Sequence, residues 1–408
     1  MALPTCDLQP SDFAAAIATQ IPQLTWEMAQ NNAKNDPYAS VFEAGTFPNY
    51  QGDTIRTLIM DRVVTGHSLT RPAVTAATQA CGTVGPQAQF GQSEFTTVLG
   101  NLRGESPLVC VKGARIVVEQ GYQAATLAQR AANKEIVLAD RRINLLDLSG
   151  LKYVAKANGT IDGNLVGGEN QTNTNFGQGV PTAAMTFKTL EGLADVLRYD
   201  FNNIQTFGDG ADENFIVIAG SAQVNKWRDE DPTIENFRAA VTGGNKEALN
   251  QLWSYAFQPL YRGLRIGIDP KPLRFSSVDG NGNPIFIEPY IVDNSPTFGQ
   301  AKNVINPAWK TAPYEVGFLI SKGAFRYLTP TRLTKIGDME WPSIAAPGQM
   351  EWINPQDLAC NKYRDFGQFI WELERAIQPI VPHGVIPFLY TRCADTLGLV
   401  SCNTDLGG

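Results

Sequence analysis

The sequence predicts an α+β fold in which one long helix organises a sheet and extended segments reach beyond the compact parts. Three observations lead to this prediction. A run from Gly121 to Gly150 has no internal glycine or proline, the stretch from 264 to 292 alternates β-rich runs with turn residues, and prolines are scattered through residues 1 to 50. Helix, sheet and arm are therefore expected in one chain.

The long helix is expected over residues 121 to 149, with Gly150 as its stop. Apolar residues recur every seven positions in two adjacent stripes, which predict one apolar face. The stripes are Ala124, Ala131, Leu138 and Leu145, beside Ala125, Ala132, Ala139 and Leu146. Five charged residues are expected on the remaining surface: Arg130, Lys134, Glu135, Arg141 and Arg142.

The chain before this helix reads as an arm followed by a projecting loop. Residues 1 to 50 combine a short amphipathic piece, Phe13 to Gln20, with Pro4, Pro10, Pro22, Pro37 and Pro48. Such a segment is expected to lie extended on another surface. A strand is expected from Thr54, and Phe95 to Leu99 is expected to form a hairpin with Leu108 to Val111.

The middle of the chain predicts an α/β layer. Helices are expected at Thr186 to Tyr199, Ala222 to Arg228 and Ile234 to Tyr255, with a buried strand at Asn214 to Ala219. Strands are expected between Leu264 and Val292, where Asp279 to Pro284 forms a hairpin turn, and at Pro313 to Ile320. The polar, glycine-rich stretch from 157 to 182 is expected to be a loop.

The last part of the chain predicts further helices and one more strand. A short helix is expected at Lys322 to Leu328, irregular chain from 331 to 362, and a helix at Phe366 to Ile377 closed by Pro379. A final strand is expected within Pro382 to Cys393, near Val385 to Tyr390.

Composition narrows the function classes. Charged residues make up 18% of the chain, below the typical share of about 25%, and hydrophobic residues make up 43%. A surface with few charges favours contact with other protein. The net charge of -7 disfavours a protein that reads nucleic-acid sequence, because such proteins carry a basic face. The sequence shows no signal peptide and no bilayer-spanning run, so synthesis in the cytoplasm is expected.

Motifs that carry chemistry were sought, and no catalytic, cofactor-binding or metal-binding residues are predicted. The six cysteines form no Cys-x-x-Cys pair, and only His67 and His383 could join them in a zinc site. Asp279, Asn281 and Asn283 have the spacing of the first three ligands of a calcium-binding loop. Pro284 and Tyr290, however, stand where that loop needs glycine and glutamate. A hairpin turn is the competing interpretation of these three residues.

Two further motifs are incomplete. Ser221 follows a buried run as a hydrolase nucleophile would, but Gly-x-Ser-x-Gly is missing, so a helix cap is the simpler interpretation. The sequence contains no Walker loop and no dinucleotide-binding fingerprint. The Asn-x-Thr matches at Asn158 and Asn170 have no signal peptide to support them.

In the order of its parts, the chain resembles the major capsid proteins of tailed bacteriophages, which share the Hong Kong 97-like fold. Two stretches, Asn306 to Ile320 and Ala376 to Tyr390, are similar to segments common in phage capsid chains. The resemblance implies an N-terminal arm at 1–50, an extended β-hairpin loop with adjoining strands at 51–115, and a peripheral domain with its spine helix at 116–182. It also implies an axial domain at 183–355 and a return with a C-terminal tail at 356–408.

The resemblance further implies a function that is structural and not enzymatic. The protein would assemble with copies of itself, as hexamers and pentamers, into an icosahedral head enclosing double-stranded DNA that it does not read by sequence. A separate scaffolding protein, a portal and decoration proteins would be its partners, with no membrane and no cofactor. The protein would be made in the host bacterial cytoplasm and would become part of the virion. Lys112 lies near the loop, but no cross-link between subunits is predicted for it.

Two alternatives stay open. An encapsulin-like compartment would have the same fold and enclose an enzyme. A cytoplasmic α/β enzyme with an unrecognised site would use the loop at 157 to 182 as a lid.

Overall fold

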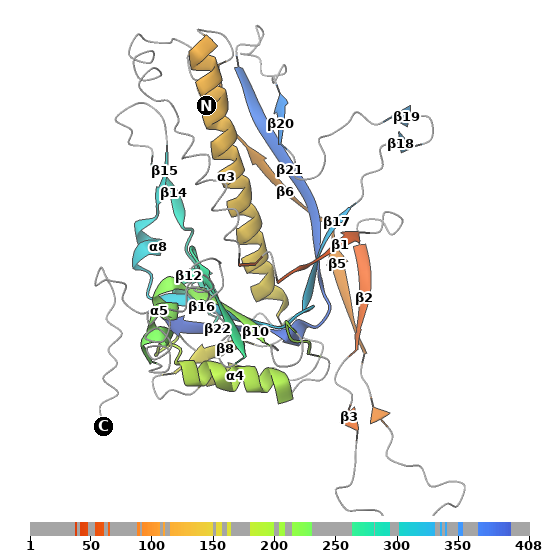
Figure 1. Ribbon diagram of the computed structural model, residues 1–408, viewed down its shortest axis with the longest axis vertical. Helices are drawn as coiled ribbons and strands as arrows, with labels where there is room; N and C mark the ends of the chain where they lie inside the picture. The colour runs from red at the N-terminus through yellow and green to blue at the C-terminus, as the bar shows by residue number, and fades with distance from the viewer. Residues whose placement is uncertain are drawn as a thin grey trace, which may run out of the picture.

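The computed structural model shows two sheets joined by a long helix, with two-stranded ribbons that project from them (Figure 1). It describes residues 37–38, 41–47, 54–60, 64–65, 88–89, 92–106, 109–110, 115–149, 152–156, 161–164, 180–199, 204–208, 214–230, 263–280, 282–293, 302–330, 335–336, 339–340, 350–353 and 366–392.

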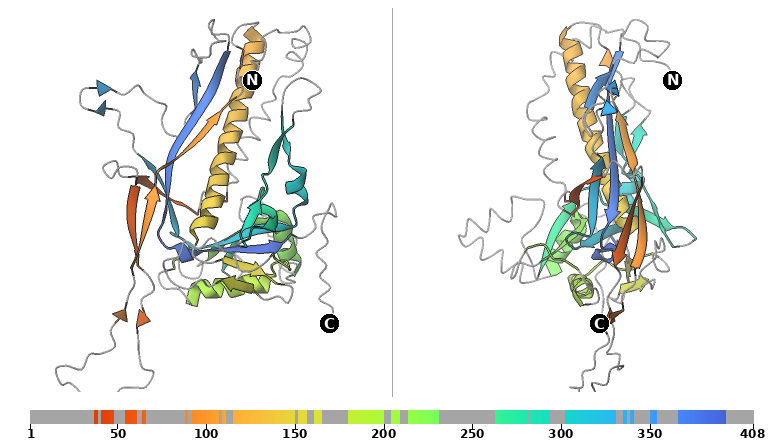
Figure 2. Two further views of the ribbon diagram at one scale, coloured as in Figure 1. Left: turned by 180° about the vertical axis from the view of Figure 1, so that it is seen from behind. Right: turned by 90° about the vertical axis from the view of Figure 1, so that its right-hand side faces the viewer.

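The first unit is helix α3, Arg115–Leu148, lying along strand β21, Phe366–Pro379. Figure 1 shows the two side by side over most of the helix, and Figure 2 shows the same from behind and from the side. Strand β21 is the centre of a six-stranded sheet. The other strands are β1 (Glu43–Phe47), β6 (Gly100–Glu105), β7 (Val109–Cys110), β17 (Phe325–Pro330) and β20 (Met350–Ile353).

The helix approaches this sheet closely because β6 carries a glycine at the contact. A Cβ atom on Gly104 would lie 2.6 Å from Gln129 Nε2 and 2.9 Å from Asn133 Oδ1. Both amides are buried, and Gln129 Nε2 donates a hydrogen bond of 2.7 Å to Asn133 Oδ1. The pair thus satisfies part of its own hydrogen-bonding capacity inside the contact.

The second unit is an eight-stranded sheet at the C-terminal end of the helix. Its main order is β11-β10-β16-β22-β8-β9, and β12 and β13 join at β16. The strands are β8 (Lys152–Ala155), β9 (Ile161–Asn164), β10 (Phe215–Gly220), β11 (Leu264–Asp269), β12 (Arg274–Val278), β13 (Pro284–Phe286), β16 (Tyr314–Ile320) and β22 (Val385–Thr391). A 3-10 turn, η4 (Pro382–Gly384), precedes β22.

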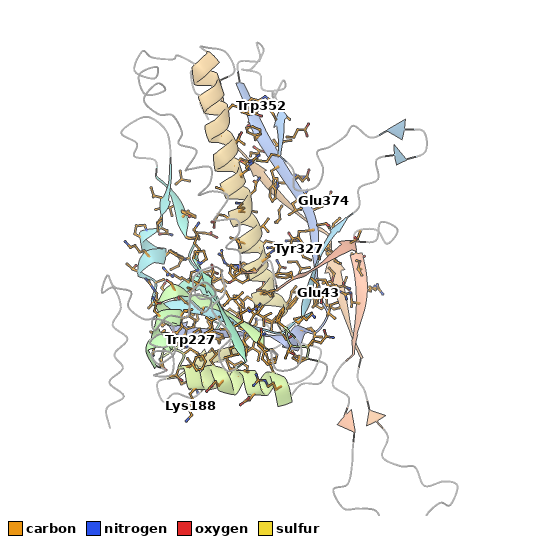
Figure 3. All side chains as sticks on the ribbon, viewed as in Figure 1. Glu43, Lys188, Trp227, Tyr327, Trp352 and Glu374 are labelled. Carbon is orange, nitrogen blue, oxygen red and sulfur yellow. The ribbon has the colours of Figure 1, made fainter. Side chains whose placement is uncertain are left out.

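Both faces of this sheet are covered, which explains why every residue of β10 is buried. Phe215, Val217 and Ala219 point into one core with α4 (Phe187–Tyr199) and α5 (Ser221–Glu230). Ile216 and Ile218 point into a second core, which Tyr38, Val41, Phe42, Leu145 and Leu146 close from the other face. The last turns of α3 and part of the N-terminal segment therefore form one layer of this unit. In Figure 3 the sticks gather densely around Trp227 in the first core.

The remaining elements are ribbons and short pieces. Strand β2 (Thr54–Met60) pairs with β5 (Gln92–Val98), and β3 (Val64–Thr65) pairs with β4 (Ala88–Gln89) further out. On the opposite side of Figure 1, β14 (Tyr290–Asp293) pairs with β15 (Lys302–Ile305), which leads into the short helix α8 (Pro307–Thr311). Strands β18 (Lys335–Ile336) and β19 (Met339–Glu340) form a small hairpin.

Many predicted elements are confirmed. The long helix, the helix at 186 to 199, the buried strand at 214 to 219, the helix at 222 to 228 and the hairpin turn at 279 to 284 all occur. The predicted helix at 234 to 255, the amphipathic piece at 13 to 20 and most of the loop at 157 to 182 lie outside the described residues, although 161–164 form β9.

The predicted helix at Phe366 to Ile377 is wrong, because this segment is strand β21. Its apolar residues Phe369 and Trp371 are buried two positions apart, and Ile370 between them pairs with both β6 and β20. Bonding on both edges decides the conformation over a local preference for helix. The predicted short helix at 322 to 328 is also wrong: Gly323 turns the chain with φ of 70°, and β17 follows.

The predicted hairpin between 95–99 and 108–111 is wrong in its partners. The first segment lies mostly in β5 and pairs with β2. The residues predicted to form the turn are strand β6 instead, and both β6 and β7 pair with β21. The final strand, β22, pairs with β16 and β8 in the eight-stranded sheet. Helix α3 reaches that sheet with its last turns, while most of its length lies on the six-stranded one.

The predicted apolar stripes of α3 are wrong in part. Ala125, Leu145 and Leu146 are buried, but Ala131, Ala132 and Ala139 are exposed. A seven-residue repeat drifts by about 20° per heptad in a straight α-helix, so the stripe turns away from the sheet. Arg142, expected on the surface, is buried.

The division of the chain into five domains stays a prediction.

Candidate self-assembly surfaces

The features relevant to assembly are the joints that fix the two units and the ribbons that leave them. The first joint is a buried ion pair between Arg142 on α3 and Asp269 at the end of β11. Arg142 Nη2 lies 2.6 Å from Asp269 Oδ1, and Nε lies 2.7 Å from Oδ2, with side-chain exposures of 4% and 2%. This two-bond geometry fixes the direction of the helix against the sheet.

The N-terminal segment joins the same group. The Tyr38 hydroxyl donates to Asp269 Oδ2 at 2.7 Å, and the Arg142 guanidinium lies 5.6 Å from the centre of the Tyr38 ring. Burial raises the pKa of Tyr38 well above its ordinary value, and the Asp269 charge adds to that rise. Burial alone would lower the pKa of Arg142, but the Asp269 charge raises it overall. Both groups therefore keep their protons at physiological pH.

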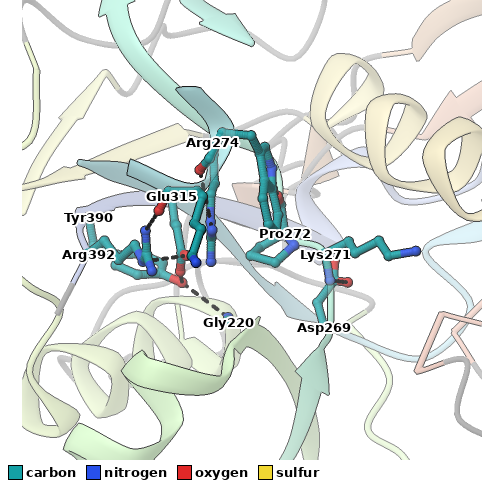
Figure 4. A network of polar contacts seen from close by, with 10 residues as sticks. Gly220, Asp269, Lys271, Pro272, Arg274, Glu315, Tyr390 and Arg392 are labelled. Carbon is teal, nitrogen blue, oxygen red and sulfur yellow. Dashed lines mark hydrogen bonds and ion pairs between the residues drawn. The ribbon is translucent and has the colours of Figure 1, made fainter. Parts of the chain in front are cut away.

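A second joint lies inside the eight-stranded sheet, around the buried carboxylate of Glu315 (Figure 4). Arg274 Nε donates to Glu315 Oε1 at 2.7 Å, and the Tyr390 hydroxyl donates to Oε2 at 2.9 Å. Arg392 Nε lies 3.6 Å from Oε1. Gly220 N in turn donates to the Tyr390 hydroxyl at 3.2 Å. One carboxylate thus connects β10, β12, β16 and the end of β22.

A third joint fixes α3 along the long strand. Arg375 on β21 donates through Nε to Asp140 Oδ2 at 2.8 Å, and its Nη2 bonds Asp140 Oδ1. Beside them, burial raises the pKa of Tyr327 to about 12, with the Asp140 charge as the second cause. Arg141 lies 5.1 Å from the centre of the Tyr327 ring. Two neighbouring charged residues of the helix thus contact the sheet, Asp140 through β21 and Arg141 through β17.

The β2/β5 ribbon is attached at its base and projects beyond it (Figures 1 and 2). Ile55 is buried with Leu328 and Ala376, and Gln378 Nε2 donates to Thr57 Oγ1 at 2.7 Å. At the other end of the unit, Tyr122, Trp352 and Phe369 stack with ring centres 4.8 to 5.1 Å apart. These contacts hold the ribbon and the far end of the helix on β21.

The structure places several residues that the sequence singled out. Asp279 closes the hairpin turn, where its Oδ1 accepts from Asn283 N at 2.8 Å. Ser221 begins α5 and is exposed, and His383 lies in η4. His67 and Lys112 are outside the described residues, as are the cysteine side chains. The joints around Asp269 and Glu315 were missed, because residues far apart in sequence form them and no local spacing signals them.

The described part of the chain contains a polar hollow, and its acidic residues, histidines and cysteines are dispersed. No group of three or more His, Cys, Asp or Glu residues there could hold a metal ion. A hollow of about 240 Å³ beside α4 is lined by Glu191, Ala194, Asp195, Arg198 and Leu264. Asp195 and Arg198, which line this hollow, form an exposed ion pair with each other at 3.4 Å. Among the helices that the structure describes, none has the length and apolarity needed to cross a bilayer.

No family model matches the chain, and no curated protein matches it. Among solved structures, the cyanophage Pam1 capsid is similar, with a TM-score of 0.48 and 11% identity over 86% of this chain and 89% of that chain. The capsid of Ralstonia phage GP4 has a TM-score of 0.47 and 11% identity, over 88% and 92%. The head of Helicobacter pylori bacteriophage KHP40 has a TM-score of 0.46 and 11% identity, over 88% and 91%.

Proposed function

We propose that this protein is the major capsid protein of a tailed bacteriophage and assembles into the icosahedral head that encloses double-stranded DNA. One observation carries the proposal: a helix of 34 residues lies along a strand of 14 residues, with a ribbon leaving that unit on one side and a separate sheet at the helix end. The resemblance implies a spine helix on a sheet, an extended loop and a further domain, so this arrangement supports the proposal.

The shape of the subunit supports assembly. A shell needs several contacts per subunit, and contacts between unlike surfaces propagate until a rotation closes them. The β2/β5 ribbon stands to one side of the helix and the eight-stranded sheet (Figure 1 and the left view of Figure 2). A projecting ribbon can cover a neighbour and add to the area that two copies bury, toward the ~800 Å² per partner of a stable interface.

The internal joints support the same function, because a shell subunit has to keep one shape. The ion pair of Arg142 with Asp269, the Glu315 network and the bond of Asp140 with Arg375 fix helix and sheets to one another. The net charge of -7 favours loose contact with packed DNA over tight binding.

In this proposal residues 1–50 are the arm, 51–115 the extended loop, 116–182 the peripheral domain, 183–355 the axial domain and 356–408 the return. The partners are further copies in hexamers and pentamers, a separate scaffolding protein, a portal and decoration proteins. The protein is made in the host bacterial cytoplasm and ends in the virion.

The test is assembly. The protein, co-expressed with the scaffolding protein of its genome, is expected to sediment as large particles that appear as closed shells in negative-stain electron microscopy. Sedimentation only as a monomer or small oligomer, with no shells in the images, would overturn the proposal. The contents of particles filled in infected cells decide between a head and a compartment, since double-stranded DNA is expected and an enclosed enzyme is not.

A further inference from the structure

Exposed large hydrophobic side chains are concentrated on the β14/β15 ribbon and on β13, which precedes it in the chain. Seven such side chains occur in the described residues, and all but Val98 and Tyr122 lie on β13, β14 and β15. Those five are Ile285, Tyr290, Ile291, Val292 and Ile305, with exposures from 37% to 57%. Contiguous apolar exposure of this kind marks interaction sites.

The register places these side chains together. Tyr290 pairs with Ile305 and Ile291 with Val304 across the ribbon. Because side chains alternate between the faces of a strand, Tyr290, Val292 and Ile305 share one face. The two charged residues of the ribbon, Asp293 and Lys302, are partners in the register and have opposite signs. Asn303, the register partner of Val292, is the one polar residue that the register places on the face of Tyr290, Val292 and Ile305. That face is therefore mostly apolar, and the charges of the ribbon balance.

The base of the ribbon is fixed to the eight-stranded sheet. Asn306 N donates to Pro289 O at 2.9 Å, and Asn306 Oδ1 caps α8 by accepting from Ala308 N at 3.0 Å. Trp309 on α8 is buried, donates from Nε1 to Pro272 O at 3.3 Å, and lies under the Arg274 guanidinium at 3.8 Å. The apolar face is thus presented in a set direction. A two-stranded ribbon is only marginally stable in water by itself, so a covering partner would stabilise it.

We propose that the apolar face of the β14/β15 ribbon, made by Tyr290, Val292 and Ile305, docks on a second copy of this chain. This inference rests on the proposed function and names one of the surfaces that it uses. Two copies with a net charge of -7 each repel one another, so a neutral apolar face is where they can touch without like-charge repulsion. One lysine contacts the face: Lys271 Nζ lies 4.5 Å from the centre of the Tyr290 ring and is paired with Glu135 at 2.5 Å. Its charge is thus already matched by a carboxylate, whereas a nucleic acid would require several unmatched positive charges.

The size of the face also favours a second copy. These few side chains cannot supply the ~800 Å² per partner that a stable two-protein complex buries. The contact is therefore useful only where other contacts join the same two molecules, as between neighbours in a shell. The ribbon lies on the side of the helix opposite to β2/β5 (Figures 1 and 2), so in a ring it meets an unlike surface of the next copy.

The experiment compares Val292→Glu and Ile305→Glu, each made singly, with Ser276→Glu on β12, which is exposed and adds the same charge on the eight-stranded sheet instead of the ribbon. Wild type and variants are assembled with the scaffolding protein over a range of concentrations, and shells are counted by sedimentation and electron microscopy. The melting temperature of each unassembled subunit is measured alongside. Because these side chains are exposed, all variants are expected to melt close to wild type.

The ribbon variants are expected to raise the concentration needed for assembly at least about tenfold, while Ser276→Glu assembles as wild type does. Assembly of both ribbon variants at the wild-type concentration would overturn the inference and leave the proposed function standing. If Ser276→Glu is impaired equally, charge and not the ribbon is responsible, which also overturns it. Failure of the wild type to form shells would overturn the proposed function and this inference with it.

Discussion

Arg142, Asp269 and Tyr38 form a buried polar group whose members come from three distant parts of the chain. Taking an ion pair out of water has a large desolvation cost, and the geometry here repays it with two direct bonds and a tyrosine hydroxyl. Lys271 N donates a further bond of 2.9 Å to Asp269 Oδ1. The group thus specifies one arrangement of arm, helix and sheet.

Removing one partner of this group should be costly. Asp269→Ala leaves the Arg142 charge buried, and we expect a loss of about 3 to 5 kcal/mol in the free energy of unfolding. The double variant Arg142→Met/Asp269→Leu should regain much of it, because no charge is then stranded. Arg103→Met is the matched control: Arg103 pairs with Glu372 at 3.2 Å but is 76% exposed, so at most about 1 kcal/mol is expected. Urea unfolding measures all three, and equal losses in the two single variants would contradict the argument.

Lys152 makes stability depend on alkaline pH. Burial lowers the pKa of Lys152 to about 8, and the Asp147 charge offsets only part of that effect. In the unfolded chain the amine titrates at about 10.4, so the unfolded state binds more protons between these two values. The free energy of unfolding should therefore rise with pH above about 8, by roughly 1 to 2 kcal/mol up to pH ~9.5.

Lys152→Met should remove this rise. Urea unfolding of wild type and variant between pH ~7.5 and ~9.5 tests it. The raised pKa values of Tyr38 and Tyr390 lower the stability as the pH approaches that of unfolded tyrosine, about 10, but they do so equally in both proteins. Parallel stability curves for the two proteins would show that Lys152 is not responsible.

At the scale of elements, prediction from sequence succeeded where local pattern and tertiary environment agree. Strand β10 is apolar throughout and is buried on both faces, and α4 has a clear apolar stripe that ends in the core with Leu190, Leu193 and Leu197. Thr186, expected near the start of α4, accepts a hydrogen bond from Thr189 N at 3.2 Å. Each of these signals lies within about four turns of chain.

Prediction failed where distant segments decide. Strand β21 contains Glu372, Leu373 and Glu374, which favour helix, but β6 and β20 bond it along both edges. The exposed face of α3 was assigned to the core because alanines repeat there, while Gln129, Asn133 and Arg142 are buried instead. Polar residues become core residues only through partners on other elements, and no spacing along α3 reveals those partners.

Two glycines test the packing of individual elements. A Cβ atom on Gly317 in β16 would lie 2.4 Å from Phe388 Cε2 and 3.2 Å from Ile218 O, and Phe388 is fully buried. Gly317→Ala should therefore destabilise the eight-stranded sheet by about 1 to 3 kcal/mol through overpacking. Gly192→Ala in α4 meets nothing within 4 Å and should stabilise by up to about 1 kcal/mol. Thermal unfolding shows whether each variant is more or less stable than wild type. A neutral or stabilising Gly317→Ala would refute the close contact.

For the whole molecule, the central feature is that α3 contributes to both units. Its middle lies on the six-stranded sheet through Gln129, Asn133 and Asp140, and its last turns enter the core of the eight-stranded sheet through Leu145 and Leu146. The direction of this helix therefore sets how the two sheets face one another. A closed shell depends on that relation, because every contact angle between neighbours follows from it.

A break within α3 should accordingly affect assembly more than a loss of packing does. Leu138 lies in the helix interior, shortly before the last turns that enter the eight-stranded sheet, and packs partly against the second core. Leu138→Pro removes a backbone hydrogen bond and should cost about 3 kcal/mol or more, with a kink between the sheets. Leu138→Ala keeps the helix and loses only side-chain contacts. We expect Leu138→Ala to form shells with the scaffolding protein and Leu138→Pro to give none or aberrant ones by electron microscopy. Normal shells from Leu138→Pro would mean that α3 does not set the geometry of the subunit.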